Sequence, residues 1–111
     1  MKMLAVGRLR DGADAHEIAR YAREEMRALW QLYRGGVVRE MYSPGRPGAV
    51  LVLEAASLQQ AEAALADLPL VSAELIVFEF IELHPFGAFE VLFADGQPLA
   101  RPAGGKDKGL A

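Results

Sequence analysis

Residues 74–83 read ELIVFEFIEL, an apolar run that only glutamates interrupt. Its β-branched and aromatic residues favour a strand. Successive side chains of a strand point to opposite faces, so a sheet with one face in water should alternate apolar and polar residues. This strand does not: one face carries Ile76, Phe78 and Phe80, and the other carries Val77, Ile81 and Leu83. Both faces of the sheet that contains it must therefore be covered.

Three further strands are predicted upstream. Residues 1–9 form an apolar segment that ends at the turn residues Asp11 and Gly12. Residues 37–43 and 49–54 flank a loop, residues 44–48, that holds two prolines and two glycines. This pattern predicts a β-hairpin.

Two helices are predicted between the strands. The first starts at Asp14, whose side chain can cap it, and stops at Gly35 and Gly36. The second starts at Ser57 and is ended by Pro69. Each carries an apolar stripe at helical spacing. The expected buried positions are Ile18, Ala22, Met26, Leu29 and Tyr33 in the first helix, and Leu58, Ala61, Leu65 and Leu68 in the second.

The order strand, helix, strand, strand, helix, strand is that of the split βαβ arrangement, which predicts an α+β, ferredoxin-like βαββαβ fold. Two helices would cover one face of a four-stranded antiparallel sheet, and the other apolar face would be exposed in a monomer. We expect a second copy to cover it, giving a homodimer or a higher homo-oligomer. The alternative is that residues 85–94, a last apolar segment, fold back over that face.

Length and composition predict one domain. A chain of 111 residues has room for a single hydrophobic core, and 52% hydrophobic with 24% charged residues is a globular composition. We assign residues 1–94 to this domain. Residues 95–111 are rich in Gly, Pro, Lys and Asp, so we expect a disordered tail there.

Charge and motif content exclude several classes of function. The net charge is -3 with both signs interspersed, which argues against nucleic acid and anionic membranes as partners. No apolar stretch approaches the ~20 residues of a membrane-spanning helix, and no secretory signal is evident. The absence of cysteine excludes disulfides and thiolate metal sites. A phosphate-binding loop, HExxH and GxSxG are also absent. We expect a cytoplasmic protein with no metal site.

The run Leu68-Pro69-Leu70, followed by a β-rich segment ending in His84-Pro85, resembles the muconolactone Δ-isomerase family of the dimeric α+β barrel superfamily. The resemblance extends from about Glu24 through Phe86. It includes Glu25 in the first helix, Arg39 in the second strand and Glu54 at the end of the third. It implies a cofactor-free proton shift on an unsaturated lactone, and assembly into dimers or larger rings.

Moving a proton between carbons needs a base that returns it, and a cation or donor near the developing enolate oxygen. The candidates for these roles are His84, Glu54, Glu82 and Arg39, to which the resemblance adds Glu25. A small ring-shaped substrate would be bound between helix and sheet by Trp30, Tyr33 and Tyr42. The structural alternatives are a histidine in a surface turn, carboxylates that reach water, a cross-strand ion pair of Arg39 and aromatic side chains in the core.

Three functions stay open at this point. They are a cofactor-free isomerase or related lactone enzyme, a cofactor-free monooxygenase of the same superfamily, and a non-catalytic module for small-molecule binding or assembly. We expect His84 and at least one of Glu25, Glu54 and Glu82 to line a common pocket with Arg39. Such a pocket would favour the isomerase.

The strands with two apolar faces predict a dimer, or a multiple of it, in dilute solution. Sedimentation velocity at micromolar concentration measures this directly. A stable monomer would contradict the argument from the exposed face and favour residues 85–94 as its cover.

Overall fold

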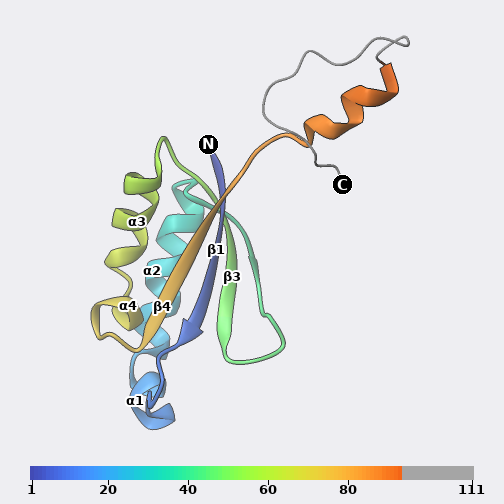
Figure 1. The fold of residues 1–111 in the computed structure, drawn as a ribbon. Coiled ribbons are helices and arrows are strands. Elements are labelled where there is room, and N and C mark those ends of the chain that lie inside the picture. The colour runs from blue at the N-terminus through green and yellow to red at the C-terminus, as the bar shows by residue number, and fades with distance from the viewer. Residues whose placement is uncertain (94–111) are drawn as a thin grey trace.

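A computed structural model describes residues 1–93, and the predicted tail, residues 95–111, lies outside the described residues. The elements are β1 (Lys2–Leu9), α1 (Ala15–Arg20), α2 (Ala22–Arg34), β2 (Val38–Tyr42), β3 (Gly48–Glu54), α3 (Leu58–Ala66), α4 (Pro69–Ser72), β4 (Ile76–Leu83) and the 3-10 helix η1 (Gly87–Phe93). The four strands form one antiparallel sheet in the order β2-β3-β1-β4 (Figure 1). The predicted ferredoxin-like fold is confirmed.

One face of the sheet packs against the helices. In the antiparallel ladder, Met3 lies opposite Leu53 and Ala5 lies opposite Leu51, and all four side chains are buried. Leu29 of α2 and residues of α3 pack on this layer. The core consists of Met3, Ala5, Leu29, Val38, Leu51, Leu53, Ala61, Leu65 and Leu68. The hydrophobic core therefore lies between the sheet and α2 and α3.

The other face of the sheet is apolar and uncovered by the described helices. Leu4 lies opposite Val52 on one side and Ile81 on the other, and Val6 lies opposite Val50. At the end of β4, Ile81 is 42% exposed. The described part of segment 85–94 does not fold back here, since Figure 1 shows η1 extending away from the sheet.

The first predicted helix is two helices. Asp14 caps α1 as expected, accepting a hydrogen bond from the backbone N of His16 at 3.0 Å. The helix then breaks at Tyr21, where ψ is -3°, and α2 starts afresh at Ala22. The expected stripe assumed one continuous helix, and in α2 it is only partly correct. Leu29 is buried as predicted, but Met26 is 58% exposed and Glu25 is buried in its place.

The second predicted helix also ends differently. Ser57 caps α3, accepting from the backbone N of Gln60 at 3.1 Å. Pro69 does not only end this helix, because it is also the first residue of α4, where a missing N–H is tolerated. After α4, Glu74 takes a positive φ of 61°, and β4 begins at Ile76 rather than at Glu74.

Glu74 occupies the left-handed position that glycine favours after a helix. The backbone N of Leu75 donates to the carbonyl of Leu70 at 2.9 Å, which closes the motif. Replacing Glu74 by Gly should raise the free energy of unfolding by about 1 kcal/mol, since glycine avoids the Cβ penalty. Urea denaturation measures this change in the free energy of unfolding. Glu74→Ala keeps the Cβ and should change little, and a Gly variant that unfolds at lower urea would contradict the assignment.

Candidate functional site

A cavity of about 240 Å³ lies between α1, α2 and α4 and one end of the sheet. It is lined by Leu9, Ile18, Glu25, Met26, Leu29, Pro47, Gly48, Ala49, Leu51, Leu70, Ile76 and Phe78. Glu25 is the only ionisable side chain in this lining. The cavity is thus an apolar pocket with one carboxylate, large enough for a small organic molecule.

Phe78 forms part of the cavity wall because Gly7 leaves room for it. The two residues are paired across β1 and β4. A Cβ built on Gly7 would lie 2.6 Å from the ring of Phe78, closer than real Cβ contacts come. The absence of a side chain at Gly7 therefore lets the ring lie against β1, and the ring in turn bounds the cavity.

Glu25 is held at the cavity by the start of α4. Its side chain is 4% exposed, and Oε1 accepts a hydrogen bond from the backbone N of Leu70 at 2.9 Å. Leu70 is the second residue of α4, so its N–H has no partner within that helix. The carboxylate therefore caps α4 from α2. Glu25 and the Leu68-Pro69-Leu70 run, which the sequence marked separately, meet in this contact.

Burial raises the pKa of Glu25 above its ordinary value of 4.5, and the hydrogen bond from Leu70 opposes part of that rise. Loss of water disfavours the charged form of a carboxylate, which explains the direction. A carboxylate of raised pKa both accepts and returns a proton more readily near neutral pH than an exposed one. The cavity therefore supplies a buried carboxylate of raised pKa, and its lining holds no side-chain cation.

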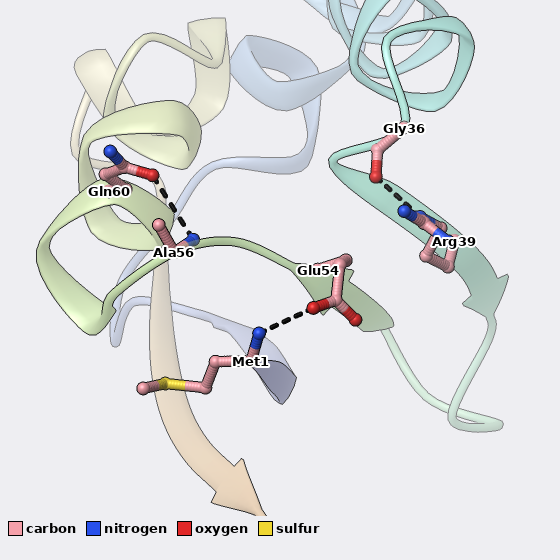
Figure 2. Close-up of polar contacts among 6 residues, drawn as sticks. All are labelled: Met1, Gly36, Arg39, Glu54, Ala56 and Gln60. Atoms are coloured by element: carbon pink, nitrogen blue, oxygen red, sulfur yellow. Dashed lines mark hydrogen bonds and ion pairs between the residues drawn. The ribbon is translucent and has the colours of Figure 1, made fainter.

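Glu54 and Arg39 do not line the cavity, and Figure 2 shows the polar contacts they make instead. The N-terminal ammonium of Met1 donates to Oε2 of Glu54 at 2.5 Å, and this hydrogen bond lowers the pKa of Glu54. Nε of Arg39 donates to the carbonyl of Gly36 at 2.6 Å. The neighbouring Glu40 accepts from the hydroxyl of Tyr42 at 2.6 Å. The ion pairs found among residues 1–93 do not include Arg39, so its cross-strand alternative is not found there.

Glu82 and His84 pair with one another at the far end of β4. Nε2 of His84 lies 3.3 Å from Oε1 of Glu82, and their side chains are 71% and 42% exposed respectively. Phe78, on the same strand, lines the cavity. At about 3.3 Å per residue, the segment from Phe78 to His84 spans roughly 20 Å. This pair is too far from the cavity to share a small ligand with Glu25 in one subunit.

The expected convergence is therefore not found within one subunit. Of the five candidate acid–base residues, only Glu25 lines the cavity. The aromatic candidates do not line this cavity either: within one subunit Trp30, Tyr33 and Tyr42 are 54%, 45% and 58% exposed. The signal for Glu25 was present in the sequence, since it stands four residues before Leu29, on the same helical face.

Two negative findings hold for residues 1–93. Over that range, no helix is both long and apolar enough to cross a bilayer. The same part of the chain holds no group of three or more His, Asp or Glu side chains placed to bind a metal ion.

Comparison with known proteins identifies the fold. No protein-family model matches the chain, and no curated protein matches it. Among solved structures, 5-chloro-2-hydroxyhydroquinone dehydrochlorinase from Burkholderia phenoliruptrix AC1100, in complex with 2,5-dihydroxybenzoquinone, is 19% identical, with a TM-score of 0.59. The match covers 76% of this chain and 94% of that one. This chain therefore has the same fold as the dehydrochlorinase.

Muconolactone isomerase is similar to the same degree. It is 20% identical with a TM-score of 0.58, and the match covers 78% of this chain and 93% of that one. The fold expected from the resemblance to this family is therefore confirmed.

The raised pKa of Glu25 predicts how stability depends on pH. Protonated Glu25 stabilises the fold at low pH, and this contribution is lost as the pH rises from the ordinary value of 4.5 through the raised pKa. Glu25→Gln keeps an acceptor for Leu70 and does not titrate. The Gln variant should therefore gain in unfolding free energy relative to wild type as pH rises, measured by urea denaturation between pH 4 and 8.

The matched control is Glu62→Gln, because Glu62 is exposed on α3. The unfolding free energy of Glu62→Gln, relative to wild type, should not rise with pH as that of Glu25→Gln does. If the unfolding free energies of wild type and Glu25→Gln changed in parallel with pH, the pKa of the buried Glu25 carboxyl would not be raised.

Proposed function

We propose that the protein is a cofactor-free enzyme that moves a proton on a small unsaturated carbonyl compound, with Glu25 as its acid–base group. The observation that carries the proposal is the buried carboxylate in an otherwise apolar cavity, with one oxygen held by Leu70. This arrangement fixes the base while leaving its second oxygen for a substrate proton.

The chemistry follows from these surroundings. Ionised Glu25 takes a proton from a carbon beside a carbonyl group, which leaves an enolate. Protonated Glu25 then returns that proton to a different carbon, so the double bond moves and no co-reactant is consumed. Apolar walls such as Leu29, Leu51 and Phe78 limit the water that would otherwise exchange with this proton. The result is an isomerisation of the substrate.

The two proteins of the same fold support this class of substrate. One is named for muconolactone and the other for a chlorinated hydroxyhydroquinone, and both compounds are small, oxygenated and unsaturated. Loss of HCl and isomerisation both remove a proton from the substrate. A cavity of about 240 Å³ suits compounds of this size.

The other two functions fit the geometry less well. A monooxygenase would use Trp30 and the tyrosines to bind an aromatic substrate, and these side chains lie outside the cavity. A binding module would use Glu25 only to cap α4 and fix a ligand. We include in the proposal that the enzyme is a homodimer, since one apolar face of the sheet is uncovered by the described helices. The proposal also retains the cytoplasmic location expected from the sequence.

Replacing Glu25 by Gln should lower turnover of the substrate by about a hundredfold or more, the usual loss for a general acid or base. Gln retains the acceptor for Leu70, so the fold should persist. The assay measures conversion of muconolactone and of 5-chloro-2-hydroxyhydroquinone, with Glu62→Gln as the control. Equal turnover by wild type and Glu25→Gln would remove Glu25 from the mechanism, whereas ligand binding without turnover by either would favour a binding module.

A further inference from the structure

The aromatic ring of Phe78 lies flat on the backbone of β1. A carbon built at the Cβ position of Gly7 would lie 2.6 Å from Cε1 of Phe78, 2.9 Å from Cζ and 3.0 Å from Cδ1. These three ring atoms are consecutive, and the two outer distances are only slightly longer than the central one. The Cβ position is therefore over the face of the ring, because a position beyond its rim would be clearly farther from the two outer atoms.

The other face of this ring is available to a ligand. Ala49, Gly7 and Phe78 form one row across β3, β1 and β4, and both Ala49 and Phe78 line the cavity. Two residues away along β4, on the same face, lie the buried side chain of Ile76 and the ring of Phe80, whose centroid is 6.4 Å from that of Phe78. Since Gly7 lies beneath the ring and these side chains flank it along the strand, the ring can rise only toward the cavity.

A flat aromatic face on the wall of an apolar cavity favours a flat, conjugated ring. Two stacked π-systems attract each other by more than their apolar burial accounts for. A saturated ring of the same size is puckered, so it touches such a face with fewer atoms. Glu25 reaches the same cavity from α2, whereas Phe78 reaches it from the sheet. A ring that lies on Phe78 is therefore enclosed together with the acid–base group.

We propose that Phe78 is the platform on which the ring of the substrate lies, and that Gly7 sets the height of this platform. The two residues determine specificity: they select flat, conjugated ring compounds over saturated ones. Ordinary contacts of a Cβ atom begin near 3.4 Å, so Gly7→Ala would lift the ring from β1 and narrow the cavity. The selection of a substrate rests on the proposed function, whereas the preference for a ligand can be measured by binding alone.

Two six-membered lactones with the same carbon and oxygen atoms test the platform. 2-Pyrone is flat and conjugated, whereas δ-valerolactone is saturated and puckered. Each is titrated into the full-length protein, and NMR follows the backbone amides of Ala49 and Leu70, which line the cavity. Wild type should bind 2-pyrone at least about fivefold more tightly, the size of one stacking contact. Phe78→Leu keeps an apolar wall without a flat face, so the two affinities should become equal.

A double-mutant cycle tests the role of Gly7. Gly7→Ala should weaken the binding of both lactones at least about fivefold, the usual cost of overfilling a packed site. The same substitution in Phe78→Leu should change each affinity by less than about twofold, because leucine does not extend over residue 7 as the ring does. Gly87→Ala is the matched control, since the space around the Cβ position of Gly87 is open. Urea denaturation checks that every variant is folded.

A preference for 2-pyrone that survives Phe78→Leu would overturn the platform, and so would the absence of binding by wild type. Equal effects of Gly7→Ala in the presence and absence of the Phe78 ring would overturn the role of Gly7. These results are separate from the test of the enzyme. If Glu25→Gln leaves turnover unchanged while Phe78 still decides the preference, only the proposed function fails. If turnover depends on Glu25 while the preference ignores Phe78, only the platform fails.

Discussion

β4 places apolar side chains on both faces of the sheet, with Ile76 packed beneath the helices and Ile81 exposed on the far side. Much of the molecule depends on how these two faces are used. The face toward the helices provides the hydrophobic core and, at one end of the sheet, the cavity. The other face of the sheet is not covered by the described helices, and the apolar side chains of residues 86–93 are exposed. The same strand therefore bears on both the cavity and the proposed assembly.

Glu25 is the one polar group that this apolar packing encloses at the cavity. A structural role explains its hydrogen bond to Leu70, since α4 needs an acceptor at its start. It does not explain why the residue is a glutamate, because an uncharged acceptor would cap α4 without the desolvation that raises the pKa of this carboxyl. The proposed function uses this carboxylate as its acid–base group.

The strands and the overall fold were predictable because alternation and helical periodicity are local properties of the sequence. The break at Tyr21 was not, because Ile18 and Ala22 keep a helical spacing across it. The left-handed turn at Glu74 carries a residue that rarely marks such turns. In the site, Glu25 came from the resemblance to a family. Within one subunit Glu25 and His84 do not meet, because the cavity beside Glu25 includes Phe78 of β4, and His84 follows that strand roughly 20 Å further along.

The central claim is that Glu25 is a buried acid whose proton affinity is raised by its surroundings. The most direct measurement is an NMR titration of the Glu25 side-chain carboxyl carbon in the full-length protein, with Glu25→Gln used to assign the signal. The account predicts a midpoint clearly above the ordinary pKa of 4.5. A midpoint at or below 4.5 would show that the carboxylate is well solvated or fully stabilised as an anion, and would contradict its role as a reversible base.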